Sequence, residues 1–146
     1  YKLSNMIDTY RSGTLSKNFI ISQEDMIELA ITDHLLWRWK IYNLLLGFET
    51  LQVEDIKSHK DSNLGLWYYG KGRELLSSER VYQEVELPFI SVYDFAKKAV
   101  NAYHNNQVDL AENYLQQLTE TSIELVEKLR DLQKIFIGQK ERFKEF

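Results

Sequence analysis

The chemistry that this sequence offers rests mainly on three histidines, His34, His59 and His104. His34 lies in the stretch DHLLWRWKIYNLLLG, where apolar spacings of three and four predict a helix and place the imidazole on its inward face. A buried imidazole is usually a hydrogen-bonded core residue, a metal ligand or a proton switch. His59 falls in a polar connection and His104 at a helix end, so we expect both rings to be solvated.

Other patterns that support catalysis are absent from the sequence. There is no cysteine, which excludes disulfides, thiol catalysis and cysteine metal sites. The sequence has no glycine-rich phosphate loop, no His-Glu-x-x-His or Glu-x-x-His pair and nothing like a nucleophile elbow. We therefore predict that the chain is not an enzyme.

Composition and charge are those of an ordinary soluble domain. The 146 residues suffice for one domain, with 44% hydrophobic and 27% charged residues. The formal net charge of −4 and the scattered basic residues argue against nucleic-acid binding. No apolar run approaches the roughly 20 residues of a membrane span, and there is no signal-peptide pattern, so we expect a cytoplasmic location without membrane contact. Because the chain begins with Tyr1, we expect it to be a piece of a longer protein.

The hydrophobic periodicity predicts an all-α fold, a four-helix bundle with short extra helical turns and a long C-terminal helix. We interpret residues 1–21 as a lead-in or linker and residues 22–146 as the domain. The motif SQED from Ser22 resembles an N-cap with an acidic first turn, and Pro88 suits the first turn of a later helix. Two short stretches, FIISQ and VYQEVELP, are the only strand candidates.

Two helical stripes are the clearest of these patterns. The first follows the helix that contains His34 and comprises Ile27, Ala30, His34, Trp37, Ile41, Leu44 and Phe48. The second alternates steps of four and three and comprises Ala111, Leu115, Leu118, Ser122, Leu125, Leu129, Leu132 and Phe136. A continuous helix over 108–140 would be about 50 Å long. We expect its far end to pair with another chain, as a homodimer through the long helices, or with an adjoining helix; a frayed, solvated end is the alternative.

Three blocks, DHLLW (33–37), LGLWYYGKG (64–72) and LPFISVYDFAKKAV (87–100), resemble the chemoreceptor zinc-binding (CZB) domain in sequence and in spacing. The resemblance runs from about residue 24 to the end of the last helix. Domains of this family are attached to cytoplasmic parts of bacterial methyl-accepting chemotaxis proteins and to some diguanylate cyclases. The resemblance implies a four-helix bundle that holds one zinc through three histidines and one cysteine.

The resemblance places the four zinc-ligand positions of the family at His34, Ser62, Phe89 and Tyr93. A serine hydroxyl stays protonated near neutral pH, phenylalanine has no donor atom, and tyrosine would have to ionise from a pKa of about 10. A structural zinc wants four nitrogen or sulfur donors, so we predict a degenerate, metal-free site with no cofactor. His59 could restore a ligand only by swinging into the site.

We expect Phe89 to fill the volume of the missing metal, and Tyr93 and Ser62 to hydrogen-bond the His34 ring. His34 is then a satisfied core histidine or, alternatively, a proton sensor that titrates near physiological pH. The aromatic residues of this region are expected to belong to the core, with a ligand pocket as the alternative: Trp37, Trp67, Tyr68 and Tyr69.

The function that the resemblance implies is a sensory or regulatory domain of a bacterial chemoreceptor-like signalling protein, with the rest of that protein as its partner. Redox or zinc sensing through a zinc-bound cysteine does not carry over, since Ser62 cannot be oxidised in that way. Two alternatives remain open. One is a structural dimerisation or docking bundle without a ligand. The other is a zinc-binding module with a changed ligand set, such as His34 with His59 and carboxylates.

Overall fold

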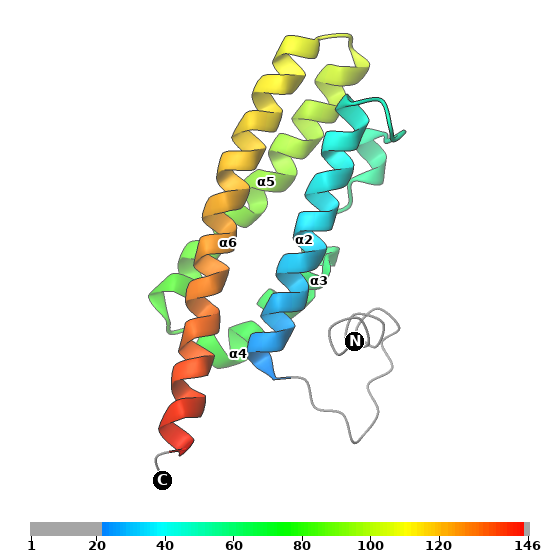
Figure 1. Ribbon diagram of the computed structural model, residues 1–146. Helices are drawn as coiled ribbons and strands as arrows, with labels where there is room; N and C mark the ends of the chain where they lie inside the picture. The colour runs from blue at the N-terminus through cyan, green and yellow to red at the C-terminus, as the bar shows by residue number, and fades with distance from the viewer. Residues whose placement is uncertain (1–21, 145–146) are drawn as a thin grey trace.

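The computed structural model describes residues 22–144, and no strand occurs among them, which confirms the predicted all-α class. Three long helices lie side by side (Figure 1): α2 (Gln23–Leu45), α5 (Arg80–His104) and α6 (Val108–Lys144). Shorter turns connect α2 to α5: η1 (Val53–Asp55), η2 (His59–Asp61), α3 (Asn63–Trp67), the π-helical turn η3 (Tyr68–Gly72) and α4 (Arg73–Leu76). The expected lead-in at residues 1–21 lies outside the described residues.

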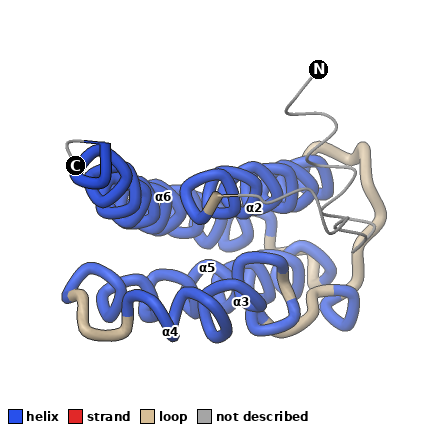
Figure 2. The backbone as a smooth tube through the Cα atoms, turned by 90° about the horizontal axis from the view of Figure 1, so that it is seen from below, coloured by secondary structure: helices blue, strands red, loops and turns tan. Residues whose placement is uncertain are grey.

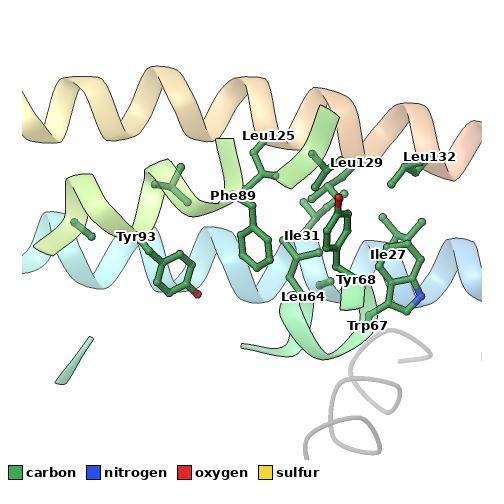
Figure 3. Close-up of a cluster of buried hydrophobic side chains, with 14 of the residues drawn as sticks. Ile27, Ile31, Leu64, Trp67, Tyr68, Phe89, Tyr93, Leu125, Leu129 and Leu132 are labelled. Atoms are coloured by element: carbon green, nitrogen blue, oxygen red, sulfur yellow. The ribbon is translucent and has the colours of Figure 1, made fainter. Parts of the chain in front are cut away.

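The helices form two layers, with α2 and α6 in one layer and α5, α3 and α4 in the other (Figure 2). The hydrophobic core fills the space between the layers. Figure 3 shows Ile31 of α2, Phe89 of α5 and Leu129 of α6 in this space, and all three side chains are almost completely buried. Every long helix therefore contributes one apolar face to a shared core.

Helix α2 begins where the sequence predicts. Ser22 is its N-cap, and the serine oxygen accepts a hydrogen bond from the Asp25 amide at 3.3 Å. Most of the predicted stripe is buried, with Trp37 half-buried. Phe48 is 79% exposed, so its assignment to the stripe was wrong. The helix ends before it because Gly47 adopts a φ of 82°, which turns the chain away.

The sequence suggested that Pro88 lies in the first turn of a helix. This prediction was wrong, because Pro88 lies inside α5. An interior proline loses one backbone hydrogen bond and costs about 3 kcal/mol. The residues before it are helical nevertheless, because Tyr82 and Val85 continue the buried stripe of Phe89. The hydroxyls of Tyr82 and Tyr68 each donate to the other residue's carbonyl at 2.6 Å and anchor this end of α5. The strand candidate VYQEVELP is therefore helical, and FIISQ lies largely outside the described residues.

Helix α6 is the predicted long C-terminal helix. Its stripe is buried from Ala111 to Phe136, apart from the half-buried Leu115. Its far end lies along the start of α2, where Gln133 donates to the Glu24 carbonyl at 3.0 Å. This contact agrees with the expectation that the end pairs with an adjoining helix. Neither α6 nor any other helix within residues 22–144 has the length and apolar character needed to cross a membrane.

The turn η2 passes unusually close to α3, and Gly65 makes this possible. A Cβ atom at Gly65 would lie 2.2 Å from the His59 carbonyl oxygen, well inside any allowed contact. The absence of a side chain at Gly65 therefore lets η2 lie directly against α3, next to Ser62.

Candidate functional site

One cavity of about 540 Å³ is lined by all four positions that the resemblance singled out. His34 comes from α2, Ser62 from the residue before α3, and Phe89 and Tyr93 from α5. These elements meet because α3 and α5 both pack on α2. Figure 3 shows the rings of Phe89 and Tyr93 extending from neighbouring turns of α5 toward the α2 side.

The His34 ring bonds to α6 rather than to the other three positions. Its Nε2 lies 2.7 Å from Ser122 Oγ, and Arg38 Nη1 donates to the same oxygen at 3.1 Å. Because arginine has no acceptor, Ser122 accepts from Arg38 and can direct its own proton to Nε2, which places the ring proton on Nδ1. The expected bonds from Ser62 and Tyr93 to His34 are not those found.

Burial determines the charge of His34. The residue is 5% exposed, and desolvation together with the nearby charge of Arg38 lowers its pKa to about 4. The ring is therefore neutral near pH 7. This geometry argues against a proton sensor working between about pH 5 and 8, since titration falls below that range. His34 is a satisfied core histidine that also forms part of the cavity wall.

Ser62, at the position of the family's cysteine, is the N-cap of α3. Its Oγ accepts from the Gly65 amide at 3.0 Å and donates to the His59 carbonyl at 2.6 Å. The hydroxyl therefore holds the backbone of η2 and α3 together.

Phe89 and Tyr93 make the α5 side of the cavity aromatic. Phe89 is completely buried, and its ring packs edge-on against Tyr93 with centroids 5.8 Å apart. Tyr93 in turn stacks on Trp37, with centroids 4.4 Å apart. Burial raises the pKa of the Tyr93 hydroxyl, so it is not ionised near neutral pH and provides no phenolate.

His59 is not solvated, contrary to expectation. Its ring is half-buried and packs edge-on against Phe89 at 5.0 Å between centroids. Its Nε2 lies 3.0 Å from the hydroxyl of Tyr69, which itself donates to Glu86 at 2.9 Å. Desolvation lowers the pKa of His59. The polar connection around it has no helical period, so the sequence offered no sign of this packing. His104 is exposed, as expected, but its Nε2 donates a hydrogen bond to the Leu51 carbonyl at 2.6 Å.

The aromatic residues divide between core and cavities. Trp67 and Tyr68 are 4% and 2% exposed and belong to the core, as expected. Trp37 is half-buried and lines the cavity with His34. Tyr69 is half-buried and lines a second cavity, of about 460 Å³.

A comparison with protein-family models adds an independent observation. The model of the chemoreceptor zinc-binding domain matches residues 34–100, a segment that contains all four positions. Residues 34–100 thus match the CZB family. No curated protein and no solved structure matches the chain.

The residues at the CZB ligand positions do not fit zinc. Phe89 has no donor atom, the Ser62 hydroxyl is engaged in two hydrogen bonds, and Tyr93 is held in its neutral form. Within residues 22–144, no group of three or more His, Cys, Asp or Glu side chains is arranged to hold a metal ion. The alternative set of His34, His59 and carboxylates is therefore not assembled, and His59 Nε2 faces Tyr69 instead.

Proposed function

We propose that this chain is a cytoplasmic sensory or regulatory domain of a bacterial chemotaxis signalling protein, and that it works without zinc and without enzymatic activity. The CZB match over residues 34–100 supports the sensory class. One observation supports the metal-free part: the four ligand positions line one cavity, yet only His34 has a side chain suited to zinc. The proposed partner is the rest of the signalling protein.

The proposed signalling route runs from the cavity to α6. His34 lines the cavity on one side and bonds Ser122 of α6 on the other. Ser122 is completely buried on the stripe through which α6 packs. A displacement of the His34 ring therefore alters a buried contact of the longest helix, which is an element suited to pass a change along its length.

Zinc titration of the chain, purified without a histidine tag, tests the metal-free proposal. We expect chelator-stripped protein to show no tight one-to-one binding, and the His34→Ala variant to give the same result. Tight binding that His34→Ala abolishes contradicts the proposal and restores zinc sensing.

A dimerisation or docking role is the second candidate, and the outer side of α2 favours it. Leu35 and Trp39 of α2 and Leu46, the residue directly after it, are 36%, 58% and 62% exposed. The α6 stripe is covered within the chain, so the proposed homodimer would use this α2 surface instead. A pure scaffold differs from a sensor in showing no thermal shift with metals or small metabolites.

A further inference from the structure

The cavity at the CZB positions has the size of a ligand site. Its volume of about 540 Å³ lies within the range of roughly 300–1,000 Å³ that is typical of small-molecule pockets. Its lining runs inward from Leu36 and Trp39, which are 48% and 58% exposed, to the buried Leu64, Phe89 and Tyr93. A ligand can therefore enter from solvent, and the inner end of the cavity that it approaches is apolar.

The charges along this cavity do not select a charged ligand. The Asp33 carboxylate already accepts a hydrogen bond from Asn63 of α3. Lys40 and Glu49 are exposed and carry opposite charges, so together they add no net charge. His34 is neutral near pH 7, because burial lowers its pKa to about 4. A charged group that entered the cavity would therefore lose hydration without gaining a free counter-charge.

The polar side chains of the inner wall are already paired. His34 bonds Ser122 through Nε2, and the Ser62 hydroxyl bonds the backbone both as donor and as acceptor. Within residues 22–144, no buried side-chain nitrogen or oxygen atom lacks a hydrogen-bond partner. A polar group of a ligand would give up its hydrogen bonds to water and find no free buried partner in exchange. The inner wall therefore favours an apolar ligand.

The outer end of the cavity holds apolar surface that a ligand can cover. Leu36 and Trp39 line the cavity and remain largely in contact with water. Trp37 also lines it, but its ring is already stacked on Tyr93, so Leu36 and Trp39 offer the free apolar surface. Covering this surface is favourable in proportion to the apolar area that is removed from water.

We propose that this cavity binds a small, neutral and mainly apolar molecule. The ligand covers Leu36 and Trp39 at the outer end and extends toward Leu64 and Tyr93 at the inner end. The inference deepens the proposed sensory function, because it names the class of the stimulus. It rests on that function for its signalling consequence only, and binding itself is tested separately.

Three probes that share a phenyl ring and differ in charge test the ligand class on the full chain. The probes are ethylbenzene, 2-phenylethylammonium and phenylacetate, titrated at pH 7 by calorimetry and by tryptophan fluorescence. We expect ethylbenzene to bind one to one and about tenfold more tightly than either charged probe, which corresponds to about 1.4 kcal/mol. Its binding should not depend on salt and should show a negative heat-capacity change. Tighter binding of a charged probe, equal affinity for all three, or no binding overturns the inference.

Two neighbouring leucines of α2 provide matched variants that spare the core. Leu36 lines the cavity, whereas Leu35 is exposed and is not among the lining residues. Leu36→Asn places an amide in the lining and should weaken ethylbenzene binding several-fold. Leu35→Asn makes the same change one position earlier and should leave the affinity unchanged. Circular dichroism checks that both variants are folded, and equal weakening by both overturns the site.

Protein concentration separates a small ligand from a second copy of the chain that covers the same surface. We expect the affinity for ethylbenzene to be the same at low and at high protein concentration, with the oligomeric state followed by sedimentation. An affinity that falls as the chain dimerises means that a second copy covers the cavity, and overturns the inference.

Hydrogen exchange separates the ligand inference from the proposed sensory role. With saturating ethylbenzene, we expect slower amide exchange in α6 around Ser122. Selective binding without any change in α6 supports the ligand class and contradicts the proposed signalling route. Absence of selective binding overturns the ligand class and leaves the sensory proposal to its own test.

Discussion

His34 is held by a residue of another helix, and this bond explains how an imidazole persists in a core without a metal. A buried ring nitrogen left unpaired would cost about 1–3 kcal/mol. Ser122 removes that cost, and it is itself the polar exception in an otherwise apolar stripe. The two polar residues satisfy each other, and Arg38 donates to the same serine oxygen.

The depressed pKa of His34 predicts how stability depends on pH. Its folded pKa of about 4 lies below the unfolded value of about 6.5, so the unfolded chain binds the proton first. The neutral His34 ring therefore makes its full contribution to the free energy of unfolding above pH 6.5. As the pH falls to 4, up to about 3 kcal/mol of this free energy is lost. Urea unfolding at a series of pH values measures this loss.

His34→Gln should be less stable at pH 7 but should lack this part of the pH slope, because its amide does not titrate. His104→Gln is the matched control, since it removes an exposed histidine and should keep the slope. A His34→Gln variant with the wild-type slope would assign the effect to other groups.

At the scale of elements, local periodicity was sufficient to predict α2 and α6, because apolar residues at every third or fourth position indicate which face of a helix is buried. The start of α5 was predicted wrongly for a physical reason. The preference of proline for the first turn of a helix is a local property. The burial of Tyr82 and Val85 depends instead on contacts with η3 and the core. These contacts keep the residues before Pro88 helical.

The site was predicted in part. The resemblance correctly grouped His34 with three positions up to 59 residues later, which now line one cavity. It could not supply the bond from His34 to Ser122, because the two residues are 88 positions apart and meet only when α2 packs on α6. The inward position of His59 depends in the same way on how η2 folds back on α5.

The close approach of η2 to α3 predicts that alanine substitutions at two glycines have very different effects on stability. Gly65→Ala places a Cβ against backbone atoms that cannot move without shifting η2, so we expect a loss of more than about 2 kcal/mol in unfolding free energy. Gly70→Ala has open space around its Cβ and should be neutral or stabilising by about 0.5–1 kcal/mol. Chemical denaturation of the two variants measures the difference; equal stabilities would contradict the packing of η2.

At the scale of the whole molecule, the positions of the CZB site remain together without the cross-link that a metal provides. Aromatic packing on the α5 side and polar contacts at α3 serve this purpose. Asn63 at the start of α3 donates to Asp33 of α2, and Tyr93 of α5 stacks on Trp37 of α2. Helices α3 and α5 are thus each joined to α2, whereas a zinc ion would join all three elements at one point.

This arrangement predicts that zinc binding can be rebuilt. A chain with Ser62→Cys, Phe89→His and Tyr93→His offers three histidines and one cysteine around the cavity, and His34 is already neutral at pH 7, as zinc requires. We expect one-to-one zinc binding and a zinc-dependent rise in melting temperature. The metal-free variant should be less stable than wild type, because Phe89→His places a polar ring in the core.

The same three substitutions with His34→Ala form the control, which should bind zinc much more weakly because one ligand is missing. If the loss of Phe89 prevents folding, Ser62→Cys with Tyr93→His keeps the core and should bind zinc through three ligands with lower affinity. Both measurements depend on α2, α3 and α5 holding their positions in the absence of metal. A folded variant that binds no zinc would mean that the cavity does not correspond to the zinc site of the family, and the argument that joins the sequence match to this cavity would fail.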